Sequence, residues 1–149
     1  MGAADPTSCI CCDIVAGRVR PPGGVVWSDE RFVVAGFADP SPLRGYVVVQ
    51  SRRHVRGLYD LDAAEAAALG PLLIRLQRAQ KSALGAEHAY AFVLGDRVHH
   101  FHAHVVPQFP DTPPHLRGGR LFQYTLADAR PVAELAAAGA TLAEALRRP

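Results

Sequence analysis

The sequence predicts an α+β domain: an antiparallel β-sheet with one long helix packed on it and a C-terminal helix. Three observations predict it. Short apolar, strand-like runs recur along the chain, one long segment has helical periodicity, and the final residues form a second amphipathic stretch. With 149 residues, of which 49% are hydrophobic and 20% charged, we expect a single domain over residues 1–149 with a sizeable core. Residues 1–8 are expected to be a loose terminus.

Five segments have the composition of strands. Residues 25–27 and 32–35 lie on either side of a turn-like sequence, and residues 46–50 give the strongest signal for a buried strand. Two further strands are expected at residues 88–94 and 99–106. The segment 108–127 is rich in proline and glycine, which predicts a loop.

The long helix is predicted to follow Asp62, because Asp62 and Glu65 have the spacing of a capping box. Its leucines recur on one face, and Gly85 is a plausible end. Pro71 is expected to kink this helix or to lie near its true first turn. Residues 132–147 are predicted to form the terminal amphipathic helix.

Composition limits the location and the partners. No apolar run approaches the ~20 residues of a membrane span, and the first residues lack a basic or apolar signal region. We therefore expect a cytoplasmic protein without a membrane partner. The net charge of +2 is too weak to indicate a nucleic-acid partner.

The most informative segment is the run His-Phe-His-Ala-His-Val-Val at residues 100–106. Because side chains alternate along a strand, His100, His102 and His104 are expected on one face, with apolar residues anchoring the other. Three imidazoles add little to fold stability, so the pattern indicates chemistry. A metal-binding histidine strand, as in cupin-like or carbonic-anhydrase-like sites, is the alternative to a nucleophile.

All three cysteines lie together near the start of the chain. Cys9 and Cys12 have the Cys-x-x-Cys spacing with which two thiolates bind one Zn²⁺ tetrahedrally. Two more ligands are needed, and His54 and His100 can supply them if their strands pair and their ends converge near the cysteines. The alternative is a set of reduced thiols, with Cys11 an ordinary core residue.

These segments together resemble the histidine triad (HIT) family, in its zinc-binding bacterial branch. The triad run fits the signature His-φ-His-φ-His-φ-φ, where φ is apolar, and the opening at residues 9–17 is similar to that of zinc-binding bacterial members. Residues 45–54 resemble the family's Gly-His, apolar strand, Pro, basic, His segment. The resemblance covers nearly the whole chain and implies the HIT fold.

The resemblance implies an enzyme that acts on nucleotide α-phosphates and takes a purine nucleotide as substrate. His102 would attack phosphorus and form a nucleotidyl-histidine that water hydrolyses, while the backbone carbonyl of His100 fixes its tautomer. His104 would hydrogen-bond the phosphate oxygens. A structural zinc would be held by Cys9, Cys12, His54 and His100. A homodimer is compatible with the resemblance, since homodimers are common in the family.

The sequence departs from the family pattern at two positions expected to contact substrate. Tyr46 stands where family members commonly carry a histidine, and Asp96 stands where they place a glutamine. Arg97 is expected not to compensate the charge of Asp96, because neighbouring strand residues point to opposite faces. Asp39 corresponds to an acidic residue that contacts ribose.

Three functions are compatible with this pattern. The preferred one is a nucleotide hydrolase or nucleotidyl transferase that cleaves a nucleoside phosphoramidate, a dinucleoside polyphosphate or an aminoacyl-nucleotide. The second is a zinc-stabilised nucleotide-binding or scaffold module, for which Tyr46 and Asp96 are the motivation. The third is a HIT scaffold repurposed for different chemistry in a dedicated pathway.

Overall fold

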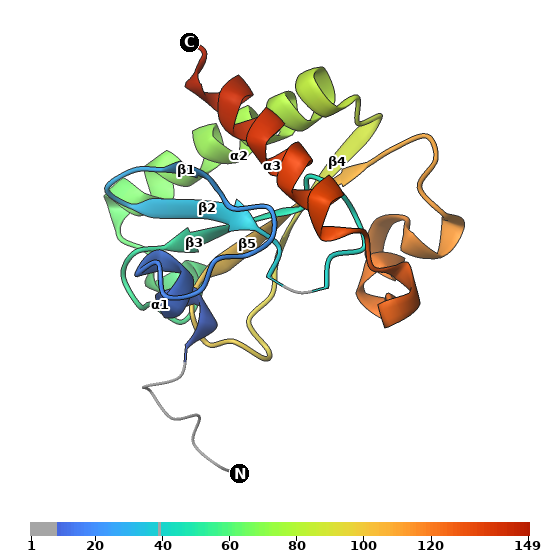
Figure 1. The fold of residues 1–149 in the computed structure, drawn as a ribbon. Coiled ribbons are helices and arrows are strands. Elements are labelled where there is room, and N and C mark those ends of the chain that lie inside the picture. The colour runs from blue at the N-terminus through green and yellow to red at the C-terminus, as the bar shows by residue number, and fades with distance from the viewer. Residues whose placement is uncertain (1–8, 39) are drawn as a thin grey trace.

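A five-stranded antiparallel sheet forms the centre of the computed structural model, which describes residues 9–38 and 40–149 (Figure 1). The strand order across the sheet is β1-β2-β3-β5-β4. The strands are β1 (Val25–Ser28), β2 (Phe32–Gly36), β3 (Val47–Ser51), β4 (His88–Val93) and β5 (His102–Gln108). The predicted α+β class, with an antiparallel sheet, is confirmed.

In the part of the chain that the structure describes, three α-helices pack with the sheet: α1 (Ile10–Val15), α2 (Ala63–Leu84) and α3 (Val132–Arg147). The start of α2 is fixed by the predicted capping box, in which Asp62 accepts from the Glu65 N–H and the Glu65 carboxylate accepts from the Asp62 N–H. Its end is Gly85, whose φ of 75° is left-handed and suits glycine.

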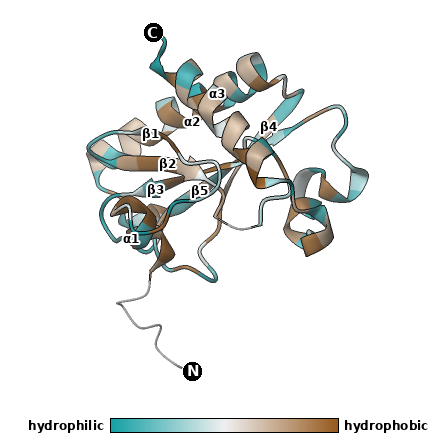
Figure 2. Cartoon of the chain, in the orientation of Figure 1, coloured by the Kyte–Doolittle hydropathy of each residue, from teal (hydrophilic) through white to brown (hydrophobic). Residues whose placement is uncertain are grey.

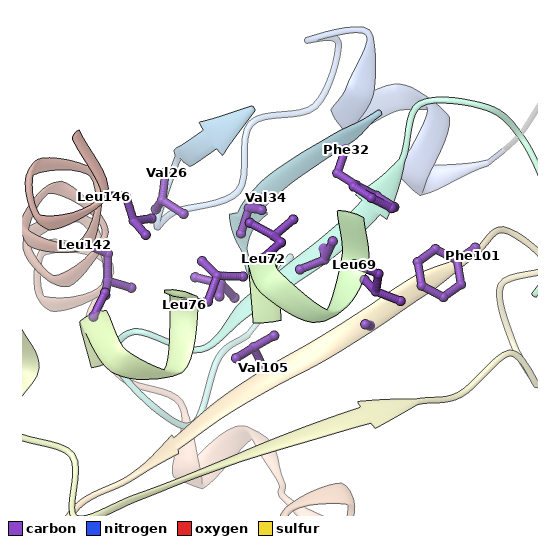
Figure 3. Close-up of a cluster of buried hydrophobic side chains, with 14 of the residues drawn as sticks. Val26, Phe32, Val34, Leu69, Leu72, Leu76, Phe101, Val105, Leu142 and Leu146 are labelled. Atoms are coloured by element: carbon purple, nitrogen blue, oxygen red, sulfur yellow. The ribbon is translucent and has the colours of Figure 1, made fainter. Parts of the chain in front are cut away.

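The main core lies between one face of the sheet and the helices α2 and α3. Figure 3 shows leucines of α2 and α3 pointing at aliphatic and aromatic side chains of the strands. Leu76 and Leu142 are fully buried in this cluster. The strand side is supplied by Val26, Phe32, Val34, Val47, Val49, Ala103 and Val105. Burial of this face is the main stabilising force of the fold and fixes which side chains point to the opposite face.

The opposite face of the sheet carries the chemistry-bearing side chains. On β3 the core-facing residues Val47 and Val49 alternate with Val48 and Gln50, and on β5 the core-facing Ala103 separates His102 from His104. The short helix α1 and the segment after β5 lie on this side of the sheet. Figure 2 shows that α1 and β2 are predominantly hydrophobic, in keeping with their packing against other elements.

The strand prediction for residues 99–106 is wrong at its start, and one of the two alternatives for Pro71 is excluded. Strand β5 begins at His102, not at residue 99, because the backbone of Phe101 instead bonds Val55 O at 2.6 Å and Ser51 N at 3.3 Å. Helix α2 runs through Pro71 from a start at Ala63, so Pro71 does not mark its first turn. The predicted loop after β5 contains three 3₁₀ turns, Pro114–Leu116, Gly118–Gln123 and Leu126–Asp128.

Within residues 9–38 and 40–149, no helix is both long and apolar enough to cross a membrane.

Candidate functional site

Two cysteines and two histidines converge at one end of the sheet, as the sequence predicts. Cys9 and Cys12 come from the start of α1, His54 follows β3, and His100 precedes β5. Their candidate ligand atoms all lie within 4.8 Å of one another. His100 Nδ1 is 3.4 Å from each of the two Sγ atoms and 3.2 Å from His54 Nδ1.

These donors fit a tetrahedral Zn²⁺. Zinc bonds of about 2.0–2.3 Å place neighbouring ligand atoms of a tetrahedron roughly 3.3–3.8 Å apart. The two distances of 3.4 Å from His100 Nδ1 to the Sγ atoms lie within this range, and the two of 3.2 Å from His54 Nδ1 to Cys12 Sγ and to His100 Nδ1 lie just below it. Two thiols and two imidazoles are also the donor set that zinc prefers. The cluster can therefore hold a metal ion with all four positions filled by the protein.

His100 is oriented for this role by its other ring nitrogen. Its Nε2 lies 2.7 Å from the Ser51 carbonyl oxygen and therefore donates, which leaves the Nδ1 lone pair facing the thiols. His100 is fully buried, and burial lowers its pKa and keeps the imidazole neutral. A neutral imidazole is the form that ligates a metal.

Local structure holds the other ligands in place. Cys9 is the N-cap residue of α1, and its Sγ accepts from the Cys12 N–H at 3.5 Å. The turn that carries His54 is attached to α2 by Arg53, whose guanidinium donates to both oxygens of the buried Glu65 at 2.8 and 2.6 Å. Arg53 lowers the pKa of Glu65, so this carboxylate stays ionised and the pair persists at neutral pH.

Cys11 is not part of this cluster. Its side chain is buried, and burial raises the pKa of its thiol to about 12, so the thiol stays protonated. Cys11 instead contributes to the wall of the neighbouring cavity. The interpretation of Cys11 as an ordinary buried residue agrees with this placement.

The three triad histidines have different surroundings. His100 faces the cysteines, whereas His102 and His104 face a cavity, with their ring centroids 5.0 Å apart. His102 Nδ1 lies 2.7 Å from the His100 carbonyl oxygen, the contact that the family resemblance implies. Because a carbonyl only accepts, Nδ1 carries the proton and the Nε2 lone pair of His102 is available.

His104 has the opposite arrangement. Its Nδ1 lies 2.8 Å from the Tyr46 hydroxyl, and burial together with His102 lowers the pKa of His104 to about 4. Burial also raises the pKa of Tyr46, so this phenol keeps its proton. A phenol is a stronger donor than a neutral imidazole, so Tyr46 donates to Nδ1 and the His104 proton resides on Nε2. His102 and His104 thus present a lone pair and an N–H.

The cavity in front of these histidines has a volume of about 410 Å³. Its walls are mainly apolar and aromatic. They include Ile10 and Ile14 of α1, the stacked rings of Phe37 and Tyr46 at 4.3 Å between centroids, and Phe122. Such a lining suits a flat, partly apolar ligand such as a nucleoside. The lining is completed by Cys11, Gly36, Ala38, Val48, Gln50, Leu94, Asp96, Arg97, Val98, His102, His104 and Tyr124.

A second cavity, of about 570 Å³, adjoins the first. Leu94, Asp96 and His102 line both, and Arg56 and Tyr59 are among the residues that line only the second. Asp96 lies in a bend and not in a strand, and Arg97 lines the first cavity beside it. The expectation that Arg97 does not compensate Asp96 rests on strand alternation, which does not apply in a bend; the structure places both residues on the wall of the first cavity.

The remaining candidate residues have the following placements. Tyr46 lines the cavity and supports His104, a contact that the sequence did not indicate. Asp39 lies outside the described residues. Sequence reasoning missed Phe37, Gln50, Phe122 and Tyr124. Gln50 had a usable signal, since it shares strand parity with Tyr46 in an otherwise apolar strand, whereas the aromatic residues have no local pattern that identifies them.

Comparisons with known proteins agree with this geometry. A protein-family model described as the HIT domain matches residues 20–111. A search of curated proteins found no match.

Solved structures similar to this chain include a Zn-bound histidine triad family protein from Mycobacterium smegmatis, with 23% identity, a TM-score of 0.72 and 94% of each chain covered. A histidine triad nucleotide-binding protein from Sulfolobus tokodaii, described as hypothetical, has 16% identity and a TM-score of 0.73, covering 93% of this chain and 91% of its own. A Hit-like protein from Bartonella henselae, described as involved in cell-cycle regulation, has 16% identity and a TM-score of 0.72, covering 95% of this chain and 99% of its own. At these identities the structural likeness concerns the fold.

Proposed function

The chain belongs to the HIT domain family, and on that premise we propose that it is a nucleotide hydrolase or nucleotidyl transferase acting at an α-phosphate. Its substrate would be a purine nucleoside phosphoramidate, a dinucleoside polyphosphate or an aminoacyl-nucleotide. The observation that carries the proposal is the pair of hydrogen bonds, His102 Nδ1 to His100 O and His104 Nδ1 to the Tyr46 hydroxyl, from which complementary tautomers are assigned. His102 offers a lone pair and His104 an N–H, side by side on one cavity wall.

The first step is attack by His102 Nε2 on the α-phosphorus. The N–P bond forms as the bond from phosphorus to the leaving group breaks, and the leaving group departs with that electron pair and takes up a proton from solvent water. The Nδ1–H bond to His100 O stabilises the positive charge that the ring acquires. Water then attacks phosphorus, releases the nucleoside monophosphate and restores the imidazole; another acceptor in place of water gives transfer.

His104 acts on the phosphate. Its Nε2–H donates to a non-bridging phosphate oxygen, where negative charge accumulates during the transfer. A neutral donor at this position stays in the same protonation state across the neutral pH range, because its pKa is about 4.

The two adjoining cavities suit a substrate with a group on each side of the reacting phosphorus. The apolar and aromatic cavity would take the nucleoside, and the second cavity, which shares His102 and Asp96 with the first, would take the leaving group. Arg56 of the second cavity is already paired with Asp60 at 3.7 Å, so among the described residues that line this cavity Asp96 is the unpaired charge. It disfavours an anionic leaving group and favours one that becomes an ammonium, which ranks phosphoramidates first among the three substrate classes.

Zinc on Cys9, Cys12, His54 and His100 would be structural. All four coordination positions are supplied by protein, so no position remains for substrate or water. The ion would fix the start of α1 and the residues that precede β5, and so hold the His100 carbonyl where it orients His102. A homodimer is also compatible with the fold, since β4 is an outer strand of the sheet.

The proposal is tested by incubating the zinc-loaded protein with adenosine and guanosine 5′-phosphoramidates, the matching dinucleoside polyphosphates and an aminoacyl-adenylate. Release of nucleoside 5′-monophosphate from at least one class is expected, with phosphoramidates fastest. Nucleotide binding without release would contradict catalysis and support the binding-module function. Neither binding nor release would support a repurposed scaffold.

Substitution of Tyr46 by phenylalanine tests the assigned tautomer of His104. Removing only the hydroxyl frees His104 Nδ1, so the ring proton is no longer directed to Nε2. We expect kcat to fall by about tenfold or more, a loss typical of one transition-state hydrogen bond. Nitrogen NMR shifts of His104 should show a mixture of tautomers in place of one. Tyr90→Phe is the matched control, because the Tyr90 hydroxyl bonds Gln108 outside the site. Unchanged kcat and tautomer in Tyr46→Phe would contradict the assignment.

A further inference from the structure

Gln50 is a polar side chain in an unusual position. It pairs across the sheet with His102, follows three valines in β3, and is only 1% exposed. It contributes to the wall of the 410 Å³ cavity. Among the residues that the structure describes, neither its Nε2 nor its Oε1 has a hydrogen-bond partner.

Gln80, the other buried glutamine among the described residues, has a structural role. It is also fully buried, but its Nε2 donates to Gly45 O at 2.9 Å and to Val105 O at 3.0 Å, joining α2 to the sheet. Only its Oε1 is unpartnered. Gln50 makes no such link. A buried carboxamide without partners destabilises a folded protein, so its presence is better explained by a ligand that completes it.

We propose that Gln50 recognises the nucleobase of the substrate, an inference that rests on the proposed nucleotide chemistry. A carboxamide presents a donor and an acceptor side by side, as does the edge of a nucleobase with an exocyclic amine or carbonyl beside a ring nitrogen. Both orphaned atoms are satisfied by such an edge. An ionised phosphate has only acceptors, so it would satisfy Nε2 and leave Oε1 unpaired.

The surroundings agree with this assignment. The cavity that Gln50 lines has many apolar and aromatic residues in its walls, with Ile14 and Phe37 among them, and these suit the faces of a flat ring. Gln50 would then form hydrogen bonds with the edge of this ring. Its carboxamide has no hydrogen bond to break when it contacts a base. An unpaired buried carboxamide lowers the stability of the ligand-free protein. Hydrogen bonds from Gln50 to the base would recover that free energy on binding.

The test is binding calorimetry of the zinc-loaded protein with the four nucleoside 5′-monophosphates and with ribose 5-phosphate, which lacks a base. The variants are Gln50→Leu and Gln50→Met, and Gln108→Leu on β5 is the matched control outside the cavity. We expect wild type to prefer one base, and both Gln50 variants to bind that monophosphate about tenfold or more weakly. Binding of ribose 5-phosphate should be unchanged. The melting temperature of the free Gln50 variants should be equal to or above that of wild type, because an unpaired buried amide has been removed.

The other outcomes overturn the inference in distinguishable ways. An equal loss for ribose 5-phosphate would place Gln50 on the sugar or phosphate, with the proposed function intact. A lower melting temperature in both variants, with all ligands weakened alike, would make Gln50 a structural residue. Wild type that binds no nucleotide would refute the proposed function, and base recognition with it.

Discussion

Replacing His102 with alanine is expected to abolish nucleotide turnover, lowering kcat/KM by on the order of 10⁴-fold or more. His102 Nε2 forms the bond to phosphorus in the proposed reaction, and neither of the other triad histidines can replace it. His104 carries its proton on Nε2, and the Nδ1 atom of His100 faces the cysteines. Steady-state kinetics on the substrate class that wild type turns over gives the measurement.

The fold should survive this substitution. His102 is half-buried at a cavity wall, and its neighbours Phe101 and Ala103 remain to anchor the strand in the core. Zinc content and melting temperature therefore serve as checks on integrity. His88→Ala on the exposed part of β4 is a matched control and should retain full activity. Substantial turnover by a correctly folded His102→Ala protein would refute its role as the nucleophile.

Replacing Cys12 with serine is expected to remove most of the bound zinc and to lower the melting temperature by on the order of 10 °C. Serine is a poor zinc ligand, and loss of a structural metal costs several kcal/mol, with ~2–4 °C of melting temperature per kcal/mol in a domain of this size. The neighbouring Cys11→Ser is the matched control. It changes a buried thiol that is not in the cluster, so metal content should stay at one ion per chain.

Metal analysis and thermal unfolding, each with and without a chelator, make the measurement. In wild type the chelator should lower the melting temperature, and in Cys12→Ser it should have little further effect. If Cys12→Ser keeps its zinc while Cys11→Ser loses it, the ligand assignment is wrong. If both keep it, the cluster is not the zinc site.

Elements with strong local signals could be predicted from the sequence. The capping residues of α2 and its terminal Gly85 act within a few residues of the chain, so both ends of this helix follow from the printed sequence. The same holds for the C-terminal helix at Val132–Arg147. The metal cluster could be predicted because its Cys-x-x-Cys spacing is local and the pairing of β3 with β5 brings the two histidines to it.

Features that depend on long-range packing could not be predicted. The start of β5 at His102 follows from backbone bonds between Phe101 and the turn after β3. The Tyr46–His104 hydrogen bond depends on side-chain rotamers across two strands, since Tyr46 precedes β3 and is not directly opposite His104. Phe122 reaches the cavity from a segment whose course the sequence leaves open.

The central claim is that His102 becomes covalently nucleotidylated. Its most direct test is the intact-protein mass after brief acid quench of wild type and His102→Ala, each mixed with adenosine and guanosine phosphoramidates and dinucleoside polyphosphates. We expect a mass increase of one nucleotidyl group on wild type alone, located on the peptide that contains His102. The same adduct on His102→Ala, or turnover by wild type with no adduct at any quench time, would contradict the central claim.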